Sequence, residues 1–164
     1  PATTGLVLLA QPLIQTFVSP AAGHLSDSMD PGTIATVGMG LTAIGLIVLM
    51  ISLPSQPLLI IIAGLAILGL GYGLFSSPNT NAIMSSVDVR HLGLASGMVS
   101  TMRSVGQLIS LAITMMVFSI IIGTVQITPE VYDQLLSSSI VIFGIFTLLS
   151  ILGIYTSYAR GPVR

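Results

Sequence analysis

The 164-residue chain is 53% hydrophobic, and Asp, Glu, Lys and Arg together make up only 5% of it. With a mean hydropathy of +1.04, it carries more apolar surface than a soluble domain of this size can bury. A formal net charge of −1 without any lysine argues against partners such as nucleic acid or polyanionic lipid, and the absence of cysteine excludes thiol chemistry.

The few charges fall in small clusters separated by long uncharged stretches, the longest of which covers residues 31–87. A bilayer core is about 30 Å thick, so about 20 apolar residues in a helix cross it once. Segments such as 58–63 are apolar on every side and lack the alternation of barrel strands. We therefore predict an all-α integral membrane protein of one membrane domain, with helices at about residues 4–22, 34–53, 58–87, 92–122 and 139–158.

Polar side chains inside these helices need an explanation, because they are costly in hydrocarbon. The first predicted helix carries Gln11 and Gln15 one turn apart. In the third predicted helix, Asn79 and Asn81 belong to a polar stretch over residues 76–81 that interrupts the helix, and Pro78 is expected to kink it. These amides are candidates for lining the cavity of a solute pathway. The alternative is hydrogen bonding between helices with no ligand.

The fourth predicted helix contains Arg103 and, one turn later, Gln107, which we add to the cavity candidates. If the helix enters the membrane at Leu92, Arg103 lies about 16 Å deep. Residues 104–122 nearly suffice to span the bilayer, however, and Arg103 then snorkels to the interface. Both positions stay open at this point.

Small residues recur every four positions on two helices. Gly69 and Gly73 do so on the third predicted helix, and Gly93 and Gly97 on the fourth. Such spacing lets helix backbones approach closely, which stabilises helix pairs in lipid. We predict helix-packing contacts at these four glycines, with a seam between moving helices as the functional alternative.

The longest predicted loop covers residues 123–138. Thr128, Pro129 and Glu130 have the pattern of a helix start. A short interfacial helix and a simple lead-in to the last helix are equally compatible with this pattern.

Arginine predicts the orientation. With five crossings, residues 23–33, residues 88–91 and the C-terminal tail share one side of the membrane. That side holds both histidines and three of the four arginines, Arg90, Arg160 and Arg164. Positive residues mark the cytoplasmic face, so we expect an integral protein of the cell membrane with a cytoplasmic C-terminus.

Two stretches carry a family resemblance. The first, at residues 23–32, matches a Gly-x-Leu-Ala/Ser-Asp core through Gly23, Leu25 and Asp27, but lacks the basic residues that usually follow. It resembles the cytoplasmic loop signature of the major facilitator superfamily. The second combines residues 69–75, Pro78 and the segment 90–103, and it is similar to the C-terminal half of the drug:proton antiporters with fourteen helices.

The resemblance implies the last five helices of a six-helix C-terminal bundle, without its first helix and the N-terminal half. It implies export of amphipathic or cationic compounds, as drug-like or toxic small molecules, by proton antiport with alternating access. It also implies a gating or structural role for Asp27. The partners are then the lipid bilayer, a missing N-terminal half or a second copy, and a small-molecule substrate. A metabolite transporter of another branch and a non-transporting assembly module are the alternatives. No nucleophile–base pair or metal-ligand spacing predicts an enzyme, a cofactor or a metal site.

Overall fold

The computed structural model describes residues 2–55, 57–123 and 131–159. All regular structure in this part of the chain is helical, and five helical segments are long and apolar enough to cross a membrane. The predicted all-α fold with five membrane-length helices is confirmed. The elements are α1 (Ala2–Leu8), α2 (Ala10–Ser28), α3 (Pro31–Ser52), α4 (Leu58–Ser85), the 3₁₀ turn η1 (Val89–His91), α5 (Leu92–Ile121) and α6 (Tyr132–Ala159).

The first two crossings are joined by a shorter connection than predicted. Helix α2 does not end near residue 22 but continues to Ser28, and Met29 then adopts an extended conformation. Asp30 starts α3 by accepting a hydrogen bond from the Thr33 backbone N–H at 2.9 Å, followed by Pro31 at the first helical position. The prediction of a loop over residues 23–33 is therefore wrong, because α2 runs to Ser28 and α3 begins at Pro31, which leaves only residues 29 and 30 between the two helices.

The last helix begins earlier than predicted, at Tyr132 instead of Ser139. Three successive serines fit inside it because each hydroxyl donates to the carbonyl four residues earlier, as Ser138 Oγ does to Gln134 at 2.7 Å. The segment after Val131 thus leads directly into α6. The predicted helix start at residues 128–130 lies outside the described residues.

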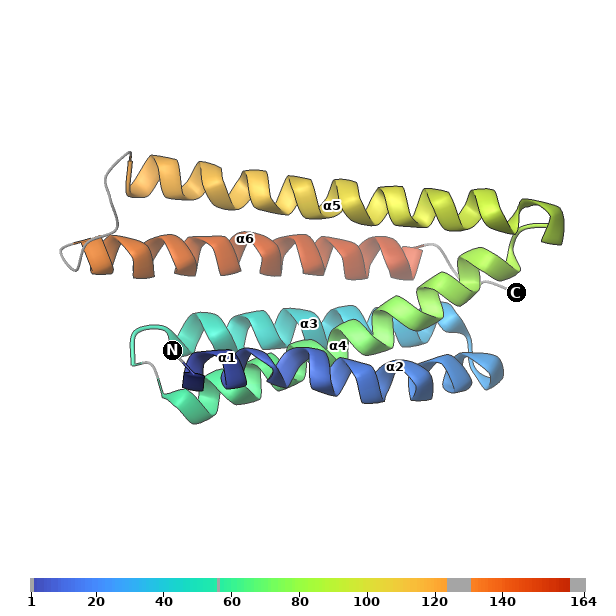
Figure 1. The fold of residues 1–164 in the computed structure, drawn as a ribbon, viewed down its shortest axis with the longest axis horizontal. Coiled ribbons are helices and arrows are strands. Elements are labelled where there is room, and N and C mark those ends of the chain that lie inside the picture. The colour runs from blue at the N-terminus through green and yellow to red at the C-terminus, as the bar shows by residue number, and fades with distance from the viewer. Residues whose placement is uncertain (1, 56, 124–130, 160–164) are drawn as a thin grey trace.

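Figure 1 shows the arrangement of the helices. α3 packs along α4, α2 packs against α4 on one side, and α6 packs against α3 on the other. α5 is outermost, lies along α6 and meets α4 near its own beginning. The ends of α2, α4 and α6 and the start of α5 share one end of the molecule, at the right in Figure 1.

Glycine residues allow the backbones of α3 and α4 to approach each other closely. A Cβ added at Gly38 in α3 would lie 2.6 Å from the Phe75 backbone nitrogen and 2.7 Å from the Gly71 carbonyl oxygen. A Cβ at Gly71 would lie equally close, 2.6 Å from the Thr42 backbone nitrogen. Such close backbones maximise van der Waals contact, the interaction that holds helices together in lipid.

Of the predicted glycine contacts, those on α4 are present and those on α5 are absent among the described residues. An added Cβ at Gly69 would lie 2.5 Å from the Gln11 carbonyl oxygen, and one at Gly73 would lie 2.9 Å from Val18 Cγ1, so both glycines face α2. Gly93 and Gly97 on α5 have no such neighbour within 4 Å in the described chain. The helix-packing contacts predicted at these two positions therefore have no partner among the described residues.

Candidate functional site

A polar groove runs between α2, α4 and α5, near the end of the molecule where α4 leads into η1. Its volume is about 370 Å³. The lining consists mainly of hydroxyl groups, with one amide and one guanidinium: Ser19, Ser76, Ser77, Thr80, Asn81, Met84, Ser96, Val99, Ser100 and Arg103.

Helical periodicity brings these side chains together. Ser76 and Thr80 are four residues apart on α4, while Ser96, Ser100 and Arg103 follow one face of α5 at intervals of four and three. The sequence interpretation missed the α5 serines as site residues, although this spacing next to Arg103 was the available signal. The groove thus results from two polar faces turned toward each other.

Helix α4 carries its polar stretch without a break. The polar stretch over residues 76–81 was expected to interrupt the helix, yet α4 continues from Leu58 to Ser85, with Pro78 fully buried within it. Proline removes one backbone N–H donor from the helix. The Thr80 hydroxyl donates to the Ser76 carbonyl at 2.8 Å, so this side chain is hydrogen-bonded within its own helix. A continuous helix keeps the polar side chains of α4 on a regular face.

Arg103 reaches across the groove. One of its guanidinium nitrogens, Nη2, donates to Ser76 Oγ at 3.3 Å and so links α5 to α4. The residue lies eleven positions after Leu92, where α5 begins, at about 16 Å along the helix axis. The hydroxyl groups around Arg103 give its charged guanidinium polar neighbours in place of lipid.

A second groove of about 350 Å³ adjoins the first. It includes Asn79, and it shares Ser76, Thr80 and Arg103 with the first groove. The remaining lining is largely apolar and aromatic, with Tyr72 and Phe75 on α4. A molecule in these two grooves would meet polar groups on one side and rings on the other.

The structure brings together three of the six predicted cavity residues. Asn79, Asn81 and Arg103 line the grooves, but Gln107 lies one turn beyond Arg103 on α5 and lines neither of them. Gln11 and Gln15 also lie outside both grooves, on the first half of α2.

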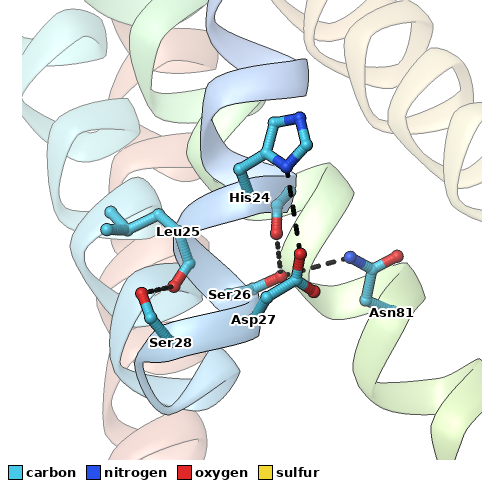
Figure 2. Close-up of polar contacts among 7 residues, drawn as sticks. His24, Leu25, Ser26, Asp27, Ser28 and Asn81 are labelled. Carbon is cyan, nitrogen blue, oxygen red and sulfur yellow. Dashed lines mark hydrogen bonds and ion pairs between the residues drawn. The ribbon is translucent and has the colours of Figure 1, made fainter.

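The residues of the loop signature lie on the last two turns of α2, as Figure 2 shows. Gly23 faces α4, since an added Cβ would come within 3.1 Å of Ser77 Oγ. Ser26 Oγ donates to the Gly23 carbonyl at 2.6 Å and accepts from Asn81 Nδ2 at 3.1 Å. The close approach at Gly23 and the Asn81–Ser26 hydrogen bond thus join the end of α2 to α4.

Asp27 and Leu25 lie at the surface of this end. The Asp27 carboxylate pairs with His24 Nδ1 at 3.9 Å, and the two side chains are 75% and 89% exposed. Leu25 is 42% exposed. Exposed pairs of this kind contribute little to stability, so Asp27 is available for a contact outside the described chain.

The Asn81–Ser26 hydrogen bond should couple α2 to α4 energetically. In a double-mutant cycle of Asn81→Ala and Ser26→Ala, we expect a coupling of about 0.5–1.5 kcal/mol in the free energy of unfolding measured in mixed micelles. The matched control pairs Asn81→Ala with Ser28→Ala, because the Ser28 hydroxyl bonds only to the Leu25 carbonyl of its own helix among the described residues. Equal coupling in the two cycles would contradict the interhelical bond.

Comparison with known proteins adds a family match. The model of the Major Facilitator Superfamily matches residues 1–163. The chain is 39% identical over 105 residues to the Uncharacterized transporter YebQ of Escherichia coli (strain K12), and 34% identical over 104 residues to the Riboflavin transporter RibZ of Clostridioides difficile (strain 630). It is 31% identical over 113 residues to the Multidrug resistance protein Stp of Mycobacterium tuberculosis.

These alignments cover 63%, 63% and 69% of the chain, but only 23%, 23% and 21% of the three relatives. The chain therefore matches less than a quarter of the length of each relative. No solved structure matches the chain significantly.

Proposed function

Because the chain belongs to the Major Facilitator Superfamily, we propose that its five helices are part of the C-terminal six-helix bundle of a secondary active transporter. It is an integral membrane protein with five membrane-length helices. The proposed activity is export of drug-like or toxic small molecules by proton antiport with alternating access. The multidrug resistance protein among its relatives supports this direction.

The observation that carries the proposal is the polar groove between α4 and α5. Outside it, these helices present mostly large apolar side chains, and residues 31–87 contain no charge. Polar groups at this depth are costly unless they face the protein interior or a water-filled cavity. A hydrated groove that begins near one end of the bundle is suited to hold a solute on its way across.

Alternating access needs a second body that rocks against this one. We propose that an N-terminal half supplies it, with a second copy of the chain as the alternative partner. The small share of each relative that the chain matches supports the first arrangement. In either case the exposed carboxylate of Asp27 at the end of α2 is placed to contact that partner as part of a gate.

Transport of a metabolite is the second candidate function. It is favoured by the relative that is named a riboflavin transporter, which is 34% identical over the aligned region. The two candidates share the same bundle and differ in the solute and in the need for a proton gradient.

The test is solute flux through the complete natural protein in proteoliposomes with an imposed pH gradient. We expect a gradient-dependent flux of fluorescent drug-like compounds that stops when the gradient is collapsed. Riboflavin flux without drug flux would favour the metabolite transporter. Absence of any flux by a protein that elutes as one folded species would contradict the proposal and indicate an assembly module.

A further inference from the structure

We propose that the groove between α4 and α5 binds the anionic group of the transported solute, with Arg103 as its main ligand. The inference rests on the proposed function, and it names the chemical class of the substrate. A planar anion such as a carboxylate is the best match to the groups that line the site.

Charge is the first argument. Arg103 is the only formally charged side chain among the residues that line the two grooves. The described acids, Asp27, Asp30, Asp88 and Asp133, all lie near helix ends or in connections. None of the described residues that line the grooves is acidic, so no described side chain compensates the charge of Arg103 there.

Hydrogen-bonding capacity is the second argument. A guanidinium has five N–H donors arranged to hold a carboxylate through two parallel bonds. Ser76 Oγ takes one of these donors, at the long distance of 3.3 Å. The hydroxyls of Ser96 and Ser100, two turns and one turn before Arg103 on the same face of α5, can each donate one further hydrogen bond. The site therefore offers an anion the remaining guanidinium donors together with these hydroxyl donors.

Exposure leaves charge as the basis of this preference. Arg103, Ser96 and Ser100 are all exposed in the described chain, so the guanidinium is accessible to a solute that enters the groove. A cation entering the groove would meet the guanidinium without a neighbouring carboxylate to compensate it. An anion would instead replace the water that solvates Arg103. The groove should thus discriminate between solutes of the same shape and opposite charge.

A purely structural role for Arg103 makes a different prediction. If Arg103 only links α5 to α4 through Ser76, its removal should loosen the helix pair and affect all solutes equally. The two roles are separable because charge selectivity responds to the binding role alone.

The experiment compares two xanthene dyes, anionic fluorescein and cationic rhodamine 123, in proteoliposomes of the complete natural protein. We expect wild type to transport fluorescein with the higher kcat/KM. Arg103→Gln should lower that value at least about tenfold, the loss of a charge-assisted hydrogen bond, and leave rhodamine unchanged or improved. Arg103→Lys should keep the preference for fluorescein over rhodamine at a lower kcat/KM, because an ammonium keeps the charge but lacks the planar pair of donors. The control is Arg90→Gln in η1, which lines neither groove.

Equal losses for both dyes in Arg103→Gln, with a lower melting temperature, would overturn the inference in favour of the structural link. Preference of wild type for rhodamine would overturn it while leaving the proposed transport function intact. Fluorescence anisotropy of the dyes on purified protein separates the two claims. Fluorescein binding that depends on Arg103, without flux, would support the anion site and contradict the transport function.

Discussion

Replacing Gly38 by leucine is expected to disrupt the packing of α3 on α4 and to abolish a stable bundle. A single added Cβ would come within 2.6–2.9 Å of three backbone atoms of α4, from Phe75, Gly71 and Leu74. Overpacking a core typically costs about 1–3 kcal/mol. The cost here should exceed that range, because backbone atoms cannot rotate away as a flexible side chain does. The measurement is the melting temperature in detergent, together with the elution profile.

Gly40 provides the matched control on the same helix. It lies two residues further along α3, and a Cβ added there would meet nothing within 4 Å. Gly40→Leu should therefore leave the melting temperature within a few degrees of wild type. Similar losses of stability for both variants would show that the contact between α3 and α4 does not cause the loss in Gly38→Leu.

Most of the fold follows from the length of the apolar segments. Bilayer thickness sets the length of a crossing, so long apolar stretches indicate the five helices, although the uncharged stretch 31–87 holds two of them and α5 contains Arg103. The ends were harder to predict. Residues 23–33 were expected to form a loop, yet α2 continues to Ser28, and the serines before residue 139 were assigned to a loop, yet they lie inside α6. At both places the backbone N–H and C=O groups form hydrogen bonds within the helix, and the local residue types did not reveal that the helix continues.

The rotation of each helix about its axis limited the prediction of the site. Gly69 and Gly97 occur in the same four-residue spacing, but only Gly69 meets a neighbouring backbone. The position along the helix axis matters as well, because Arg103 and Gln107 share one face of α5 one turn apart and only Arg103 lines the grooves. Where a helix is apolar on nearly all sides, its sequence carries little information on which side faces a partner. The contacts between helices decide this, and they depend on segments far apart in the chain.

A pair of cysteine substitutions should give opposite results in a test of membrane sidedness. The chain contains no cysteine, so added thiols are readily assigned once the complete protein is cysteine-free. Ser55 precedes α4 and Ser86 follows it, and both residues are exposed. The 28 residues of α4 extend about 42 Å, more than the hydrocarbon thickness. The two positions should therefore lie on opposite sides of the membrane.

The distribution of positive charge predicts which side is which. Arg90 and His91 lie in η1 just after Ser86, and His24 lies at the same end of the molecule. The connection that contains Ser55 has no basic residue. Since positive residues accumulate in the cytoplasm, we place Ser86 and the end of α6 on the cytoplasmic side.

Labelling with a membrane-impermeant maleimide tests directly whether these helices cross the bilayer. In intact cells, Ser55→Cys should react and Ser86→Cys should not, and inside-out vesicles should reverse the pattern. Reaction of both variants from the same side would show that α4 does not cross, and the reversed pattern in intact cells would contradict the orientation.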